Sequence, residues 1–211
     1  MGGHGCHIIF VLDMSGSMSR QWGGVVSAYK QYVARRRQNQ NESDLVSIVQ
    51  FDSSATTSAR QVSIGNVPND LTFRGGGTQF GPSAKMALEI GSESPVSHVP
   101  SVIFMSDGMA GDAPYATNAF TQLSNKVRRV HNCYLELHVI AFGGGASTSQ
   151  LQSIASSSPN GKLHLSADTA ELSNIFVDIA SGGSLIDRIQ SEIGKCISEA
   201  VSDKISAEYF A

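Results

Sequence analysis

The chain has 211 residues, the size of one medium domain, and 41% of them are hydrophobic, which is enough for a folded core. Its 15 Lys and Arg against 18 Asp and Glu give a net charge of −3, which argues against a protein that binds nucleic acid through a basic surface. The longest strictly apolar run, Ile8 to Leu12, is far shorter than the ~20 residues of a membrane span, so no transmembrane segment is expected.

The first six residues, 1–6, are predicted to form a flexible leader ahead of the first strand. We find no secretory signal, because the apolar stretch that follows is short and ends in Asp13. Three cysteines, Cys6, Cys133 and Cys196, stand far apart, and their odd number is typical of free thiols in a reducing compartment. We therefore expect a cytoplasmic location.

Apolar runs alternate with helix-length stretches along the chain. The first run, His7 to Leu12, is continuously apolar, as in a central parallel strand that is covered on both faces. The stretch Ala59 to Ile64 alternates and is predicted to be an edge strand. The remaining strands are expected at Leu45 to Phe51, Ser101 to Met105, Leu135 to Phe142 and, as a weaker edge, Lys162 to Leu165.

Helices are expected between these strands, at Gly24 to Arg37, Gly81 to Ile90, Ala116 to Val130, Ser149 to Ser156 and Thr169 to Ala180. Asp168 is a predicted N-cap of the last of them, with Glu171 three residues further on. Strands alternating with helices predict a three-layer, doubly wound, Rossmann-like α/β fold with a mostly parallel sheet. The basic runs Arg35–Arg37 and Lys126–Arg129 fall late in predicted helices, where cations stabilise the helix end, so no nucleic-acid partner is expected.

The glycine pair Gly182-Gly183 is predicted to end the α/β domain, which spans 7–183. The remainder, 184–211, is predicted to contain a further amphipathic helix with the isoleucines Ile186, Ile189 and Ile193 on one face. This helix either packs back onto the domain or mediates self-association.

Hard oxygen donors follow the ends of two predicted strands. Asp13, Ser15 and Ser17 form a tight turn after the first strand, and Asp107 follows another strand directly. Thr78 adds a hydroxyl on a glycine-rich loop before a helix. Ligands of parallel sheets bind at the carboxyl ends of the strands, and carboxylate and hydroxyl oxygens suit Mg²⁺, Mn²⁺ or Ca²⁺.

In this order, the motifs resemble a von Willebrand factor A (VWA) domain with its metal-ion-dependent adhesion site. Asp13, Ser15 and Ser17 match the DxSxS element of that site, Thr78 its distant threonine and Asp107 its distant aspartate. The resemblance implies a mostly parallel sheet with one antiparallel edge strand, flanked by helices.

The resemblance also implies a function without catalysis, namely divalent-metal-dependent protein–protein interaction. Bound Mg²⁺, with Mn²⁺ or Ca²⁺ as substitutes, would be coordinated directly by Ser15 and Ser17, and by Thr78 directly or through water. Asp13 and Asp107 would act mainly through water, which leaves an open position for an Asp or Glu carboxylate of a partner protein. The partner-binding surface around the metal is predicted to comprise Met14, Gly16, Met18, Gly77 and Gly108.

The main alternative is a Mg²⁺-dependent hydrolase or phosphotransferase on the same kind of fold, with Asp13 as nucleophile. Enzymes of this type carry a second acid two residues further on, where this chain has Ser15, and no lysine lies in the motif loops. A nucleotide-binding loop is disfavoured as well, because Gly75-Gly76-Gly77-Thr78 matches neither GxGxxG nor GxxxxGK[ST].

Overall fold

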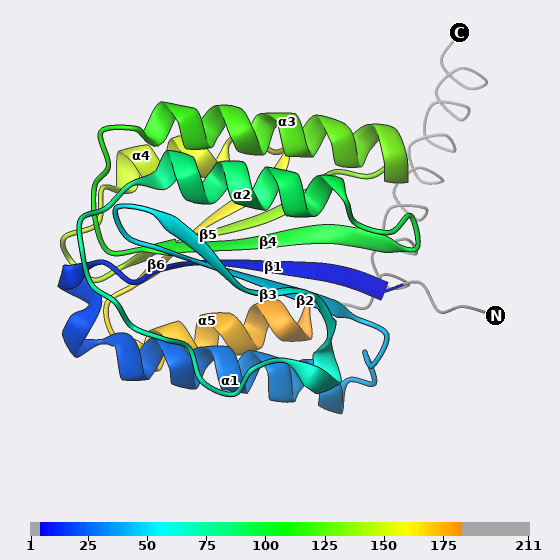
Figure 1. The fold of residues 1–211 in the computed structure, drawn as a ribbon, viewed down its shortest axis with the longest axis horizontal. Coiled ribbons are helices and arrows are strands. Elements are labelled where there is room, and N and C mark those ends of the chain that lie inside the picture. Colours follow the sequence, from blue (N-terminus) through cyan, green and yellow to red (C-terminus); the bar gives the residue numbers. More distant parts are fainter. Residues whose placement is uncertain (1–4, 183–211) are drawn as a thin grey trace, which may run out of the picture. The chain divides into compact units, whose positions relative to one another are not determined.

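The computed structural model describes residues 5–182 of the protein (Figure 1). The chain divides into two units, residues 1–181 and 182–211. Most of the predicted leader and the predicted C-terminal helix lie outside the described residues. The architecture below is therefore that of the first unit.

One six-stranded sheet runs through this unit, with the strand order β3-β2-β1-β4-β5-β6. Its strands are β1 (Gly5–Asp13), β2 (Leu45–Phe51), β3 (Ala55–Ser63), β4 (His98–Ser106), β5 (Glu136–Phe142) and β6 (Asn160–Ser166). Strand β3 is antiparallel to β2, and every other neighbouring pair is parallel. The predicted doubly wound, mostly parallel sheet with one antiparallel edge is thus confirmed. The chain winds outward from β1 in both directions, so the sheet has its switch point between β1 and β4.

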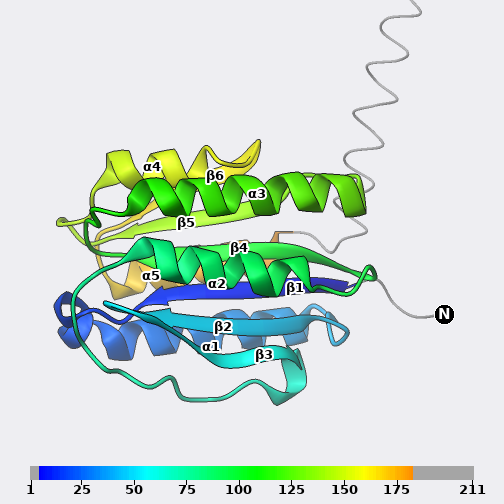
Figure 2. The ribbon, with the colours of Figure 1, turned by 45° about the horizontal axis from the view of Figure 1, so that its top comes forward.

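Helices cover both faces of the sheet (Figures 1 and 2). They are α1 (Trp22–Gln38), α2 (Phe80–Ser92), α3 (Ala113–His131), α4 (Thr148–Ala155) and α5 (Thr169–Ser181), with short 3₁₀ helices η1 (Gly16–Arg20) and η2 (Ile64–Asn66). Helices α1 and α5 pack on one face, while α2, α3 and α4 pack on the other. None of the described helices is long and apolar enough to cross a bilayer.

Local sequence signals explain where several helices begin and end. The Asp168 carboxylate accepts hydrogen bonds from the amides of Ala170 and Glu171, which confirms the predicted N-cap of α5. Helix α3 has Pro114 in its first turn, where no amide donor is needed, and it is followed by Asn132 in the left-handed conformation.

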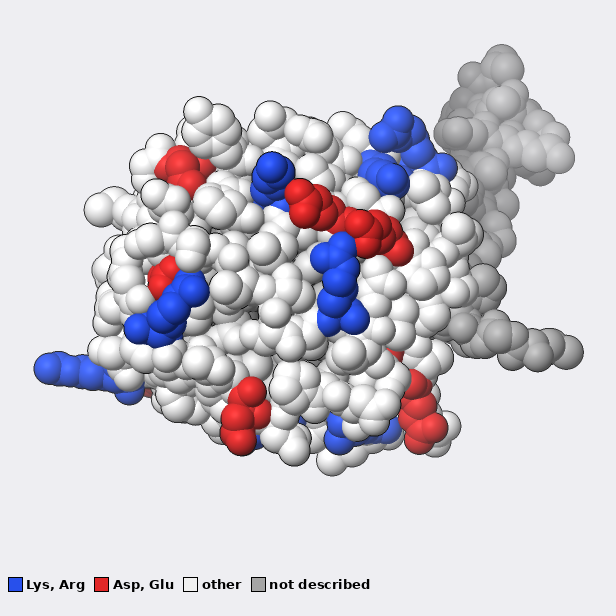
Figure 3. All heavy atoms as spheres, viewed as in Figure 1, with Lys and Arg blue, Asp and Glu red and all other residues white. Residues whose placement is uncertain are grey.

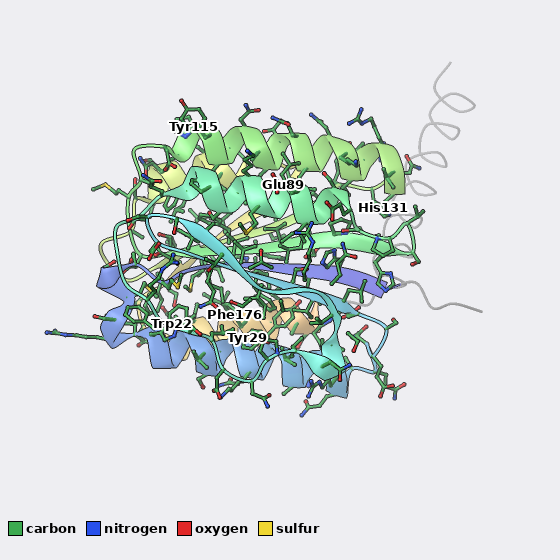
Figure 4. The ribbon with its side chains drawn as sticks, viewed as in Figure 1. Trp22, Tyr29, Glu89, Tyr115, His131 and Phe176 are labelled. Carbon is green, nitrogen blue, oxygen red and sulfur yellow. The ribbon has the colours of Figure 1, made fainter. Side chains whose placement is uncertain are left out.

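Aromatic side chains fill the core on both sides of the sheet. On the α1/α5 side, the Phe10 ring lies 5.3 Å from that of Tyr29 and 6.0 Å from that of Phe176. Tyr29 and Phe176 are labelled in Figure 4. On the opposite side, Phe104 packs against Phe51 and Phe80. Successive side chains of β1 pack into the cores on opposite faces of the sheet, and all nine residues are buried. This burial on both faces explains why the strand is continuously apolar instead of alternating.

Several strand boundaries differ from the sequence prediction by a few residues, among them the starts of β1 and β3. Strand β1 begins at Gly5, inside the predicted leader, because Gly5 and Cys6 pair with His98 and Val99 of β4. Strand β3 begins at Ala55, four residues before the predicted start. Its first half is polar and exposed and is held by backbone pairing with β2. The sequence there therefore shows no alternating hydrophobic pattern.

One histidine is buried in the central strand. His7 lies between two serine hydroxyls: its Nδ1 is 2.6 Å from Ser94 Oγ and its Nε2 is 2.8 Å from Ser47 Oγ. Burial lowers the pKa of His7 to about 4, and the nearby His98 and Arg60 add to the effect. The imidazole therefore stays neutral in the folded protein down to mildly acidic pH.

This burial predicts a stability that falls on acidification. Between pH 6.5, the ordinary histidine value, and about 4, the unfolded chain takes up a proton at His7 that the folded chain does not. The free energy of unfolding should therefore decrease as the pH falls through this window, by up to ~1.4 kcal/mol per pH unit. Urea titrations at pH 7.5, 5.5 and 4.5 should show a steeper loss for the wild type than for His7→Gln. Parallel pH profiles would contradict this assignment, because the two proteins share every other titrating group.

Candidate functional site

Three loops meet where β1 and β4 end, at the left of Figure 1. They are the turn after β1, Asp13 to Ser17, the turn after β4, Ser106 to Gly108, and the loop before α2, Gly75 to Gln79. Parallel strands bring the first two together, and backbone hydrogen bonds bind the third to the first. The Gly16 amide donates to the Gly76 carbonyl at 2.9 Å, and the Gly75 amide donates to the Met14 carbonyl at 3.1 Å.

Asp13 lies buried beneath these loops and connects two of them. Its side chain is fully buried, and both carboxylate oxygens accept hydrogen bonds. Oδ1 accepts from the Ser15 amide at 2.8 Å, and Oδ2 accepts from the Ser106 hydroxyl at 2.6 Å. The first of these bonds shapes the turn, and the second joins β1 to the end of β4.

A chain of hydroxyl contacts leads from the buried turn to the surface. Ser15 Oγ lies 3.1 Å from Ser17 Oγ, and Ser17 Oγ donates to Asp107 Oδ1 at 2.8 Å. Ser15 is buried, whereas Ser17 is exposed and Asp107 is half-buried. Asp13, Ser15, Ser17 and Asp107 therefore form one hydrogen-bonded cluster that opens to solvent at Ser17.

Thr78 approaches the same cluster from the third loop. A methyl group added at Gly108 would lie 3.4 Å from Thr78 Oγ1 and 3.8 Å from Ser106 Oγ, so the threonine hydroxyl lies beside the Ser106–Gly108 turn. The structure thus brings all five sequence-predicted metal ligands, Asp13, Ser15, Ser17, Thr78 and Asp107, to one corner of the fold.

The cluster carries two carboxylates that are not paired with a cation from the described residues. Burial raises the pKa of Asp13 to about 6, and the charge of Asp107 adds to this rise, whereas hydrogen bonds from Ser106 and Ser15 oppose it. Burial also raises the pKa of Asp107. Among residues 5–182, no lysine, arginine or histidine forms an ion pair with either carboxylate. Two such carboxylates leave negative charge that a bound cation would neutralise.

The donor atoms fit a hard divalent cation. Together with Thr78, the cluster offers three hydroxyls and two carboxylates, and oxygen ligands of this kind suit Mg²⁺, Mn²⁺ and Ca²⁺. In the described part of the chain, this corner included, no group of three or more His, Cys, Asp or Glu side chains is placed to hold a metal ion. The candidate site is therefore recognised by its hydroxyls, not by a cage of charged ligands.

The structure corrects part of the predicted partner-binding surface. Gly16 and Gly77 are exposed and Gly108 is half-buried, so their backbone is accessible beside the cluster. Met14 and Met18, in contrast, are buried in the core under α1, with exposed fractions of 3% and 0%. The prediction that these two side chains face a partner is wrong, because the turn directs them beneath the site.

Comparison with known families identifies the fold. The model of the von Willebrand factor type A domain matches residues 7–178, so the chain belongs to this family. A search of curated proteins found no match.

Solved structures share the fold at low sequence identity. Proximal thread matrix protein 1 from the mussel byssus has a TM-score of 0.66 and 18% identity over 82% of this chain and 46% of its own. The pilus adhesin SpaC from Lactobacillus rhamnosus GG has a TM-score of 0.66 and 12% identity over 86% of this chain and 31% of its own. The matched chains are thus more than twice as long as the segment they share with this one. Another structure of the mussel protein, with 22% identity over 85% of this chain and 45% of its own and a TM-score of 0.63, is described as having a zinc-occupied MIDAS motif.

Sequence reasoning missed several residues that build the site. Ser106 was not among the predicted site residues, yet its hydroxyl donates a hydrogen bond to Asp13. Asp112 was not singled out, although its carboxylate accepts hydrogen bonds from the Phe80 and Gly81 amides at 2.9 and 2.8 Å. It therefore caps α2 from a distance of about thirty residues, and no local pattern reveals such a cap.

We expect Asp112→Ala to destabilise the domain by ~1–2 kcal/mol, because two partly buried amides at the start of α2 lose their acceptor. Asp112→Asn keeps one acceptor oxygen and should lose less. Urea denaturation of the three proteins at pH 7.5 measures the difference. A free energy of unfolding unchanged in Asp112→Ala would contradict the assigned capping role.

Proposed function

We propose that this protein is a divalent-cation-dependent protein-interaction module with its binding site at the Asp13–Ser17 corner. The observation that carries this proposal is the single hydrogen-bonded cluster of Asp13, Ser15, Ser17 and Asp107, which holds two carboxylates that no cationic side chain of residues 5–182 pairs with. Thr78 completes the set from the neighbouring loop. Membership of the VWA family and the likeness to a pilus adhesin support the same function.

The environment of each side chain suggests its role. Ser17 and Thr78 are accessible enough for their hydroxyls to bind a cation, and Ser15 lies directly against Ser17. Both oxygens of Asp13 already accept protein hydrogen bonds, which suits a residue that orients the serines and supplies charge from behind them. Asp107 orients the Ser17 hydroxyl in the same way.

A carboxylate is the expected partner group. When bound, Mg²⁺ supplies an electrophilic centre that keeps part of its coordination shell for other oxygen ligands. Ser17, Gly16 and Gly77 leave the corner open to an approaching side chain. We therefore infer that the partner presents an Asp or Glu at this corner. Mg²⁺ is the proposed ion, with Mn²⁺ or Ca²⁺ as substitutes.

The enzymatic alternative has less support. A nucleophile must reach its substrate, but the Asp13 carboxylate is fully buried and both of its oxygens are occupied by hydrogen bonds. We propose that the protein is not an enzyme. Turnover of a phosphate ester by the wild type, lost in Asp13→Ala, would favour the hydrolase instead.

The basic residues do not form a nucleic-acid surface in our proposal. In the run Arg35–Arg37, Arg36 is buried and forms an ion pair with Asp44 at 2.5 Å, and Arg37 donates to the Ile64 carbonyl. Lys, Arg, Asp and Glu are interspersed on the face in Figure 3. A cytoplasmic location stays a prediction from the sequence.

The first test is cation binding by the wild type and by Ser15→Ala/Ser17→Ala. We expect saturable Mg²⁺ binding in isothermal titration calorimetry with chelator-treated protein. The double variant should bind Mg²⁺ at least about tenfold more weakly, because it loses two hydroxyl oxygens that would coordinate the cation. Equal affinities of the two proteins would contradict the proposed site.

A matched control removes two hydroxyls elsewhere. Thr121→Ala/Ser153→Ala deletes exposed hydroxyls that donate only to carbonyls of their own helices. Its Mg²⁺ affinity should equal that of the wild type, so a loss in this control would point to a general effect of hydroxyl removal.

The second test concerns the open position. At constant ionic strength, replacing chloride by acetate should raise the apparent Mg²⁺ affinity of the wild type, because a carboxylate that binds the loaded site stabilises it. The increase should be absent in Ser15→Ala/Ser17→Ala. An affinity that acetate leaves unchanged in the wild type would argue against recognition of a carboxylate.

A further inference from the structure

An ion pair next to the candidate site bridges two loops. Arg74 Nε donates to Asp52 Oδ2 at 2.8 Å, and Arg74 Nη2 donates to Asp52 Oδ1 at 2.6 Å. The Asp52 side chain is 6% exposed, whereas that of Arg74 is 42% exposed. The Ser54 amide also donates to Asp52 Oδ1 at 2.9 Å, which fixes the carboxylate on the β2–β3 turn. This two-pronged geometry holds the guanidinium in one orientation.

The same β2–β3 turn binds the loop on either side of Thr78. The Gly77 amide donates to Ser53 Oγ at 2.9 Å, and the Gln79 amide donates to the Asp52 carbonyl at 2.9 Å. Thr78 lies between these two anchored amides. Its backbone position is therefore set by residues 52 and 53.

Arg74 restrains the other end of this loop. Between Arg74 and Thr78 the chain turns through Gly75 and Gly76, whose φ angles of +76° and +151° leave it few local restraints. Gly76 packs directly on the carboxylate, since a methyl group there would lie 2.9 Å from Asp52 Oδ2. The ion pair thus compensates for the freedom that these glycines introduce.

We infer that Asp52 and Arg74 are positioning residues of the cation site, which hold the Thr78 loop against the Asp13–Ser17 turn. This inference rests on the function proposed above. The loop reaches the turn through two backbone bonds only, Gly16 to Gly76 and Gly75 to Met14. Without the ion pair, the glycine-rich loop samples positions in which the Thr78 hydroxyl no longer faces Ser106 and Gly108.

The sign of the effect separates positioning from simple electrostatics. Arg74 is a positive charge close to a site for a positive ion, so its removal would raise cation affinity if charge alone mattered. Positioning predicts the opposite. We expect Arg74→Gln to lower Mg²⁺ affinity about tenfold in isothermal titration calorimetry, as for other residues that orient metal ligands.

A double-variant cycle tests whether the effect passes through Thr78. If it does, Arg74→Gln should cause little further loss of Mg²⁺ affinity in a Thr78→Ala background. The control is Arg60→Gln, which breaks the ion pair between Arg60, 43% exposed, and Glu93 and should leave Mg²⁺ affinity unchanged. Arg74→Lys replaces the two-pronged guanidinium contact with Asp52 by a single contact, so it should lower Mg²⁺ affinity less than Arg74→Gln does. This variant keeps the test usable if Arg74→Gln is poorly folded.

A measurement without metal tests the loop directly. Amide hydrogen exchange of Gly77 and Gln79 should accelerate about tenfold in Arg74→Gln but not in Arg60→Gln, while amides of β1 keep their protection. Unchanged exchange, or Mg²⁺ affinity equal to or above that of the wild type, would overturn the inference. A wild type that binds no Mg²⁺ would refute the proposed function itself, whatever the exchange rates show.

Discussion

The parallel pairing of β1 with β4 is the constraint on which the site depends. Its register sets Leu12 opposite Met105, so the next residues, Asp13 and Ser106, meet at the end of the two strands. Their 2.6 Å hydrogen bond closes the switch point of the sheet and buries the Asp13 carboxylate. A shift of one residue would turn every side chain of β1 to the opposite layer, so the core of both faces fixes this meeting point.

A buried carboxylate without a cationic partner is costly to the fold, and the raised pKa of Asp13 expresses that cost. The structure reduces this cost with donors from the Ser15 amide and the Ser106 hydroxyl, but no residue of the described part of the chain forms an ion pair with Asp13. A buried charged residue that lowers the stability of the fold is typical of functional positions. A cation supplied from solution would offset this cost, which connects the electrostatics of the corner to the proposed function.

The sequence was sufficient to predict the elements that have a regular hydrophobic pattern. The core strands were placed to within a few residues, because burial on both faces leaves continuous apolar runs such as Ile8 to Leu12. The first half of β3 was missed because it is held by backbone pairing at an exposed edge. The five residues predicted as ligands could be singled out because each follows or precedes an element that the pattern already located, and their role as ligands stays a prediction.

Contacts between distant loops could not be predicted in this way. Asp52 and Arg74 are ordinary turn residues until the fold brings them together, and Asp112 caps a helix that precedes it by about thirty residues. Met14 and Met18 were misplaced for a related reason: adjacency to the motif does not determine which way a side chain points. Tertiary packing determines both the contacts between distant loops and the direction of these side chains.

The central claim is that a divalent cation binds at this particular corner, and anomalous diffraction tests it most directly. Crystals grown with Mn²⁺ and measured near its absorption edge should show an anomalous peak among the oxygens of Ser15, Ser17 and Thr78. A peak at another place alone, or no peak at saturating Mn²⁺, would contradict the account.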